Sequence, residues 1–172
     1  RYADDFVILC RSPEEATQAL AAVQEWTAAA GLTLHPTKTR IVNATDDGFE
    51  FLGYRFENGK RYPRTKSLEK LKDTIRAKTK RTSGQCLRAI IGSLNPTLRG
   101  WFEYFKHSDR WTLTRLDQWI RMRLRSLLRK RLGLKGRGRG ADHHRWPNAF
   151  FAKQGLYSLK TAHELACQSS SR

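Results

Sequence analysis

The chain has 172 residues, of which 39% are hydrophobic and 28% charged, so it can bury the core of one ordinary domain or of two small ones. Its net charge of +17 is extreme and unevenly distributed. Residues 1–59 contain five Lys/Arg and nine Asp/Glu, whereas residues 60–172 contain 28 Lys/Arg and seven Asp/Glu. This asymmetry predicts a polyanionic partner for the second half. Nucleic acid is favoured over a membrane, because no long apolar span or signal peptide accompanies the basic residues.

The cysteines indicate a reduced setting. Cys10, Cys86 and Cys167 are odd in number, lie far apart and form no Cys-x-x-Cys pair. This pattern argues against a disulfide framework and against a structural zinc site. We therefore expect a cytoplasmic protein.

The first 63 residues have mixed α/β character. Residues 6–10 predict a buried strand, and a helix is expected from Ser12 to Gly31, with Ser12 as its N-cap and Glu15 completing a capping box. A β stretch is expected around residues 39–43. Residues 49–56 carry aromatic side chains at near-alternate positions and predict one strand, from which a turn leads to a short partner strand.

The second half has helical spacing. Apolar residues predict a helix over residues 68–75, a second over residues 87–94, a third restarted by Asn95 and Pro96, and a long last helix over residues 113–127. We expect a three- or four-helix bundle whose boundary lies near Pro63. The glycine- and arginine-rich segment 133–140 predicts a flexible basic linker before a short terminal module.

Two adjacent carboxylates, Asp4 and Asp5, directly precede an apolar run. Carboxylates beside a core need positive charge, and magnesium is the usual ion for hard oxygen ligands. Phosphoryl transfer to a nucleotide uses two such ions. On a strand the two side chains would point to opposite faces, so both can be metal ligands only at a tight turn. The alternative is an Asp-Asp turn that binds no metal.

The basic half is expected to bind RNA through its cationic side chains. Four arginines recur at roughly helical spacing opposite the Leu/Ile stripe, namely Arg115, Arg121, Arg125 and Arg129. Such a face can follow phosphates, and the alternative is a solvated helix face. The remaining members of the predicted RNA-binding set are Arg99, Lys130, Arg137 and Arg139. Trp111 could stack on bases, as could Trp101 and Trp119, although core packing is favoured for the last two.

Several motifs resemble, in the same order, those of bacterial group II intron-encoded reverse transcriptase/maturases. The sequence Tyr-Ala-Asp-Asp at residues 2–5 resembles the metal-binding motif of the palm. Residues 31–39 resemble the element that follows the palm helix, with Lys38 as its lysine. The sequence Phe-Leu-Gly-Tyr at residues 51–54 resembles the primer-grip hairpin. Residues 91–105 resemble the thumb segment called domain X, and residues 119–125 and 146–159 resemble the portions that follow it.

The resemblance implies an α+β fold with four parts. These are the C-terminal part of a reverse-transcriptase palm over residues 1–63, a helical thumb or domain X over residues 64–132, a basic linker over residues 133–145 and a short nucleic-acid-binding module over residues 146–172. It also implies that the parent protein is an RNA-directed DNA polymerase that assists intron splicing and mobility.

The same resemblance implies roles for individual residues. Asp4 and Asp5 would bind Mg²⁺, and Lys38 would lie near the triphosphate as a third catalytic residue. The primer grip would consist of Phe51, Leu52, Gly53 and Tyr54. The implied partners are group II intron RNA, target DNA, a primer and a dNTP, and a homodimer of the parent is a further expectation.

The family's palm also needs an Asp on an earlier strand and fingers that close on the nucleotide, and neither lies in these residues. We therefore expect no polymerase activity from the 172 residues alone. The alternative function is a non-catalytic RNA-binding splicing factor or a remnant of one. A third option is a retron or diversity-generating enzyme. Residues 94–105 argue against it, because they resemble the thumb segment of the group II intron proteins.

Overall fold

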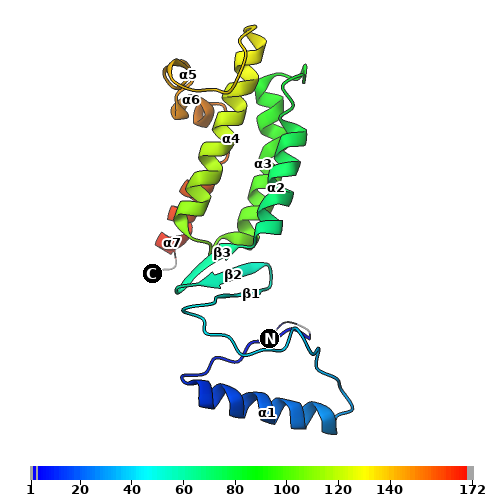
Figure 1. Cartoon of the computed structure of the whole chain (residues 1–172). Coiled ribbons are helices and arrows are strands. Elements are labelled where there is room, and N and C mark those ends of the chain that lie inside the picture. Colours follow the sequence, from blue (N-terminus) through cyan, green and yellow to red (C-terminus); the bar gives the residue numbers. More distant parts are fainter. Residues whose placement is uncertain (1, 3, 170–172) are drawn as a thin grey trace. The chain divides into compact units, whose positions relative to one another are not determined.

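The computed structural model describes residue 2 and residues 4–169, so Ala3 of the predicted metal motif and the last three residues of the predicted terminal module lie outside it. The chain forms two compact units, Arg1–Gly48 and Phe49–Arg172, which we call the first unit and the helical unit. Helices and one small antiparallel sheet confirm the α+β prediction (Figure 1). The four-part division at residues 63, 132 and 145 stays a prediction.

The helix of the first unit begins as the sequence predicts. It is α1 (Pro13–Ala29), and the Ser12 hydroxyl accepts a hydrogen bond from the backbone N–H of Glu15 at 3.1 Å. The Glu15 carboxylate accepts from the backbone N–H of Arg11 at 2.7 Å, rather than from that of Ser12. The reciprocal bond of a capping box is therefore shifted by one residue, although it still fixes the entry of the chain into the helix.

The two strands predicted in the first unit are wrong. Residues 6–10 and residues 39–43 have no strand conformation, and Phe6 to Leu9 are all exposed, Leu9 by 84%. A strand is stable only when its N–H and C=O groups pair with a neighbouring strand. The described residues offer neither segment a neighbour, and the bridge found in this region joins Tyr2 to Asp5. The apolar composition of these segments was therefore not sufficient to predict a strand.

The sheet of the helical unit is formed by β1 (Phe49–Phe51), β2 (Tyr54–Glu57) and β3 (Lys60–Pro63) in the antiparallel order β1-β2-β3. The prediction of one strand over residues 49–56 is wrong, because the chain reverses at Leu52 and Gly53. These residues have φ of 47° and 77°, as the tightest hairpin turns require. Phe49 and Phe56 then face each other across the hairpin, and their rings stack at 4.9 Å.

Within the helical unit the longest helices are α2 (Thr65–Lys78), α3 (Leu87–Phe105) and α4 (Arg110–Arg131), followed by α5 (Ala141–Arg145), α6 (Asn148–Lys153) and α7 (Leu159–Ser169). One hydrophobic core joins α2, α3, α4, α6 and α7. The predicted stripe of the last long helix is confirmed, since Leu113, Ile120 and Leu124 are at most 1% exposed. Burying this stripe stabilises the bundle, because each large apolar side chain contributes about 1.5–3 kcal/mol.

The predicted restart at Asn95 and Pro96 is wrong, because α3 continues through both residues. Asn95 does not cap a helix. Its amide donates to the carbonyl of Gly155 at 2.8 Å and accepts from the N–H of Tyr157 at 2.9 Å. Pro96 has no N–H and so removes one hydrogen bond from the helix. Its ring crowds the carbonyl of the residue four positions earlier, which is Gly92. Tertiary contacts to a distant segment therefore override a local stop signal.

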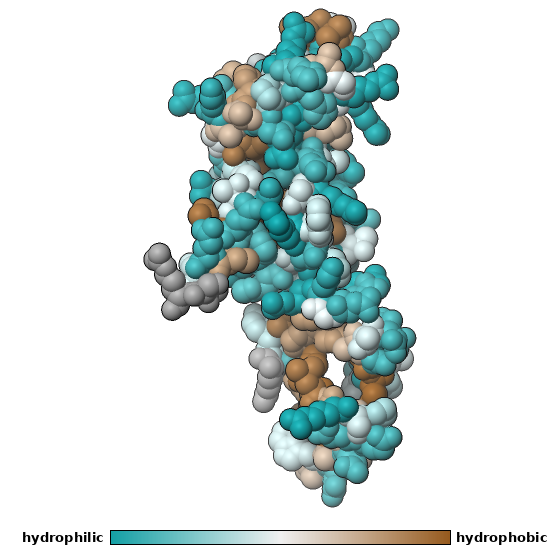
Figure 2. Space-filling view, turned by 90° about the vertical axis from the view of Figure 1, so that its left-hand side faces the viewer, coloured by the Kyte–Doolittle hydropathy of each residue, from teal (hydrophilic) through white to brown (hydrophobic). Residues whose placement is uncertain are grey.

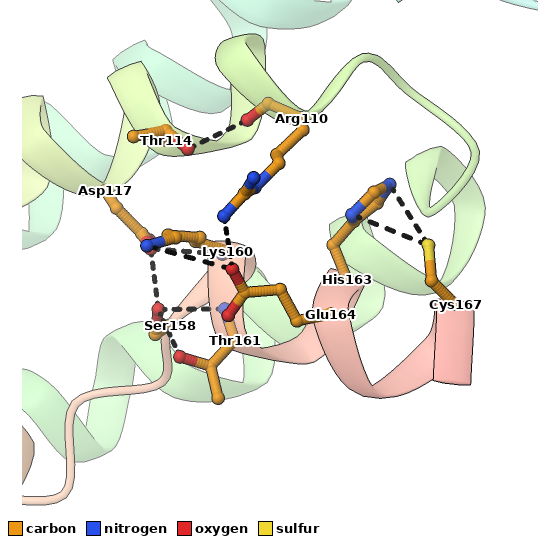
Figure 3. Close-up of polar contacts among 9 residues, drawn as sticks. All are labelled: Arg110, Thr114, Asp117, Ser158, Lys160, Thr161, His163, Glu164 and Cys167. Atoms are coloured by element: carbon orange, nitrogen blue, oxygen red, sulfur yellow. Dashed lines mark hydrogen bonds and ion pairs between the residues drawn. The ribbon is translucent and has the colours of Figure 1, made fainter. Parts of the chain in front are cut away.

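A carboxylate on α4 caps the beginning of α7 (Figure 3). Asp117, which is 3% exposed, accepts hydrogen bonds from the Ser158 hydroxyl at 2.7 Å and from the N–H groups of Leu159 and Lys160 at 3.0 and 3.1 Å. A negative charge at this end satisfies otherwise unpaired donors and complements the helix dipole. Arg110 and Glu164 add an ion pair at 2.7 Å, so α7 is held on α4 at two points.

Candidate nucleic-acid interface

The predicted metal ligands lie at a tight turn in the first unit. The N–H of Tyr2 donates to the carbonyl of Asp5 at 2.8 Å, and the N–H of Asp5 donates to the carbonyl of Tyr2 at 2.9 Å. Asp4 and Asp5 are both exposed. No three His, Cys, Asp or Glu side chains in the described part of the chain form a group that could hold a metal ion. The two aspartates offer the hard oxygens that Mg²⁺ prefers, but a complete site would need further ligands besides them.

Lys38 lies on a separate exposed turn of the first unit, formed by residues 36–38. The turn is closed by a hydrogen bond from the N–H of Thr39 to the carbonyl of His35 at 3.1 Å. Among the described residues, no hydrogen bond or ion pair joins Lys38 to Asp4 or Asp5. Direct contact therefore does not assemble the three predicted catalytic residues.

The predicted primer-grip residues are fastened to the end of α3. The Tyr54 hydroxyl donates to the carbonyl of Tyr104, and the Tyr104 hydroxyl donates to the carbonyl of Leu52 at 2.8 Å. Burial raises the pKa of Tyr54 above its ordinary value. Gly53 has a left-handed φ, and a side chain there would lie within 4 Å of Tyr104 and Phe105. Glycine at this position is therefore explained by the turn itself and by its packing against α3. Contact of this hairpin, including Phe51, with a primer stays a prediction.

We predicted that Arg125 lies on a solvated, RNA-facing side of α4. This prediction is wrong, because the side chain is buried and only 2% exposed. Its Nε donates to the carbonyl of Trp146 and its Nη2 to the side chain of Asn148, both at 2.9 Å, and its guanidinium lies 5.2 Å from the ring centre of Phe151. Burial and then the charge of Arg121 lower the pKa of this arginine. Arg125 is therefore an internal anchor for the chain after α4.

Arg121 and Arg129 are also drawn into the fold. The side chain of Arg121 is 17% exposed and lies 3.9 Å from Asp117. Arg129 donates to Asp142 at 2.8 Å and to the carbonyl of Lys135 at 2.8 Å. Of the four periodic arginines only Arg115 is exposed. Periodicity along one helix could not show this, because residues 135–148 pack over Arg125 and Arg129, and Arg121 lies beside Asp117.

The glycine-rich segment 133–140 is docked on α4 rather than extended as a flexible linker. Its Gly138 is buried, and the N–H of this glycine donates to the Ser126 hydroxyl at 3.1 Å. A Cβ at this position would lie 2.5 Å from the Cβ of Arg125, which is too close for any side chain. The Asp142 carboxylate then accepts from the backbone N–H of Arg139 at 3.0 Å. Glycine is thus used here for close approach to a helix.

The loop after α2 and the segment that ends α4 and follows it lie at the end of the helical unit remote from its sheet (Figure 1), and they carry seven exposed cations. We call them the basic end: Lys80, Arg81, Lys130, Arg131, Lys135, Arg137 and Arg139. Side-chain hydrogen bonds join its loops, since Arg81 donates to the carbonyl of Gly136 at 3.4 Å and Arg131 donates to the carbonyl of Gln85. Figure 2 shows hydrophilic side chains over most of the visible face of the helical unit.

The stretches of sequence that carry the basic end contain no acidic residue, and the adjacent Asp142 is paired with Arg129. Residues 74–102 contain six Lys/Arg and residues 118–141 contain nine, and neither range contains Asp or Glu. Charges of one sign without partners repel one another and attract a polyanion. The predicted residues Lys130, Arg137 and Arg139 belong to this cluster. Arg99 lies elsewhere, exposed on α3, with its guanidinium 4.7 Å from the ring centre of Tyr157.

One further arginine beside the basic end was missed by sequence reasoning. The Nε of Arg123 donates to the hydroxyl of Thr79 at 2.7 Å, and Arg123 and Arg76 lie 5.5 and 5.6 Å from the ring centre of Trp119. Burial, followed by the charges of Arg76 and Arg81, lowers the pKa of Arg123. Within the described residues no carboxylate pairs with it. The spacing of Trp119 and Arg123 was visible in the sequence, but the contact with Thr79 was not.

Family models match most of the chain. Residues 1–56 match the reverse transcriptase (RNA-dependent DNA polymerase) family, and residues 68–146 match the maturase-specific domain of group II introns. No curated protein is significantly similar to the chain. Among the described residues, no helix combines the length and the apolar character that crossing a membrane requires.

Proposed function

The chain belongs to the family of group II intron reverse transcriptase/maturases, which are RNA-directed DNA polymerases that also assist splicing, and from this premise we propose that its helical unit binds the phosphate backbone of intron RNA through the basic end. The observation that carries the proposal is the gathering of seven exposed cations from two stretches of sequence without acids. Neutralising phosphates releases counterions, so the affinity falls steeply with salt.

The packed arginines have a different role in this proposal. Arg125 and Arg129 hold residues 135–148 against α4, and the backbone they fix presents Lys135, Arg137 and Arg139. The cationic side chains are thereby held on a rigid scaffold instead of a disordered tail, which lowers the ordering cost of binding. Shape and phosphate position, not base sequence, would then dominate recognition of a folded RNA.

A gel-shift series with intron RNA between 50 and 200 mM salt tests this proposal. The variant with Lys130→Gln, Lys135→Gln and Arg137→Gln is expected to bind more weakly and to lose about two to three units of the salt slope. The matched control neutralises three exposed lysines outside the basic end, Lys66, Lys70 and Lys153. Equal losses in the two variants would show that net charge, and not the basic end, governs binding.

The parent's polymerase chemistry is assigned to the first unit. Reverse transcriptases act with divalent metal ions, and we propose Mg²⁺ with Asp4 and Asp5 as two of its ligands and Lys38 near the triphosphate. Mg²⁺ would activate the primer hydroxyl and stabilise the departing pyrophosphate. Because the described residues contain only part of a metal-ligand set, we propose that the 172 residues alone do not polymerise. RNA-templated DNA synthesis by this chain that disappears with Asp4→Ala would contradict that.

The remaining assignments complete the proposal. Target DNA, a primer and a dNTP would be partners of the parent polymerase, which would act as a homodimer in the bacterial cytoplasm. The alternative is a non-catalytic splicing factor, favoured for the isolated chain by its well-packed helical unit. Intron RNA bound no more tightly than an unrelated structured RNA of equal length would exclude a specific maturase role for it.

A further inference from the structure

A second candidate site lies at the opposite end of α4 from the basic end. A groove of about 240 Å³ opens between β3 and the first turns of α4, and its lining consists of Lys60, Tyr62, Asp109, Trp111, Thr112 and Arg115. Trp111 is in the first turn of a 22-residue helix whose last residue is Arg131. At 1.5 Å per residue the two lie about 30 Å apart along the axis. The groove is therefore separate from the basic end.

The exposure of Trp111 distinguishes it from the other tryptophans of the helical unit. Trp101, Trp119 and Trp146 pack against the hydrophobic core, whereas Trp111 is 69% exposed. Trp26 of α1 is similarly exposed, at 66%, but its helix contains three Glu and no Lys or Arg. Trp111 combines an exposed indole with cations in a common groove, which it shares with Lys60 and Arg115.

The groove is held in place by hydrogen bonds of Asp109. Its backbone N–H donates to the carbonyl of Arg61 at 2.7 Å, which fixes the start of α4 on β3. Its carboxylate accepts from the N–H groups of Trp111 at 2.9 Å and Thr112 at 3.4 Å, so the one acidic residue of the lining is occupied as a helix cap. The backbone that carries Trp111 is thus ordered before any ligand binds.

We propose that this groove binds an unpaired nucleobase of a nucleic-acid strand, which stacks on Trp111 while the neighbouring phosphates pair with Lys60 and Arg115. Aromatic side chains beside cations are the combination that single strands require, because every base has a π face and every nucleotide a charge. The volume is below the roughly 300 Å³ of a pocket for a complete small ligand, so the groove accommodates part of a longer polymer. This site adds base stacking to the phosphate contacts of the proposed function.

The test uses the full 172-residue chain and labelled 12-nucleotide strands of oligo-U, of oligo-dT and of an abasic strand of equal length. Dissociation constants are measured by fluorescence anisotropy at one fixed salt concentration. Trp111→Ala is expected to weaken binding of the intact strands about 5- to 100-fold. It should leave binding of the abasic strand unchanged, because that strand keeps its phosphates and lacks the stacking partner.

Three further variants separate stacking from charge and from folding. Trp111→Phe keeps an aromatic face and should retain most of the affinity for intact strands. Trp26→Ala removes an equally exposed indole from the first unit and should change nothing. Arg115→Gln should weaken intact and abasic strands alike and lower the salt slope by about one. Neutralising the basic end likewise affects both kinds of strand, so failure of that proposal is distinguishable from failure of this one.

Two results would overturn the proposal. One is an equal loss for intact and abasic strands in Trp111→Ala, which would make the tryptophan a support for a phosphate contact only. The other is unchanged strand affinity accompanied by altered self-association in sedimentation, which would identify the groove as a protein interface. A loss confined to oligo-U or to oligo-dT supports the site and identifies the strand as RNA or DNA.

Discussion

The two units of this chain distribute charge and apolar surface in opposite ways. Residues 1–48 contain four Lys/Arg and seven Asp/Glu, and they expose apolar side chains such as Leu9, Trp26 and Leu32. Residues 49–172 contain 29 Lys/Arg and nine Asp/Glu, yet they include all the buried hydrophobic core residues that the structure describes. Strong positive charge is therefore compatible with a packed core, because most cations lie on the surface of the helices and loops while the apolar stripes face inward.

The largest expected effect tests whether the core stabilises only the helical unit. Leu124→Ala removes a fully buried side chain from the centre of α4 and should lower the free energy of unfolding by about 2–5 kcal/mol. Leu9→Ala, at an exposed position of the first unit, should change it by no more than about 0.5 kcal/mol. Guanidinium unfolding followed by circular dichroism measures both. Similar costs at the two positions would refute the contrast between the units.

The buried arginine provides the next test. Arg125→Lys keeps the charge but cannot form the two hydrogen bonds to Trp146 and Asn148, so we expect a loss of about 2–3 kcal/mol in unfolding free energy. The matched change Arg88→Lys on the surface of α3 should fall within about 0.5 kcal/mol. If both variants melted like the unmodified chain, Arg125 would not be an anchor.

A smaller effect tests whether the basic segment 133–140 is part of the fold. Gly138→Ala places a Cβ against that of Arg125 and should destabilise the chain by about 1–3 kcal/mol. Gly100→Ala, in open space on α3, should instead stabilise it by up to about 1 kcal/mol through its higher helix propensity. Thermal melts of the pair give opposite signs if the segment is docked and equal signs if it is free.

The smallest effect is a pH dependence of the same docking. The backbone N–H of Arg139, followed by the side chain of Arg129, holds the pKa of Asp142 below its ordinary value of 3.8. The resulting stability is present above that value and is lost as the pH falls through the lowered folded pKa. Melting temperatures at pH 7 and at successive steps below pH 4 should therefore fall less steeply in Asp142→Asn. Parallel curves would show that this carboxylate does not stabilise the docked segment.

Local signals were sufficient where a structure depends on neighbours in the sequence. Ser12 and Pro13 determined the start of α1, and the spacing from Leu113 to Leu127 determined the buried stripe of α4. The Asn58–Gly59 turn before β3 followed from its residue types. The family resemblance was likewise local, since it rested on short motifs, and the family models matched the motif regions up to residue 146.

Prediction failed where a distant segment changed the outcome. Asn95 reads as a helix cap until residues 155–157 occupy its amide, and Arg125 reads as a solvated cation until Trp146 and Asn148 surround it. The predicted strand at residues 6–10 failed for the complementary reason, because the described residues offer no partner strand. For Asn95 and Arg125 the decisive hydrogen bonds join groups that the sequence places far apart.

The sequence by itself determined the family, the α+β class, the helical character of residues 68–127 and the strong basic character of residues 60–172. These properties depend on composition, on periodicity and on motifs of a few residues. The tertiary structure decided which cations remain exposed: it buried Arg125, paired Arg129 and left Arg115 beside Trp111. The physical reason is that a guanidinium is stable inside a protein only where a carbonyl, an amide or a carboxylate meets it, and folding alone brings those groups together.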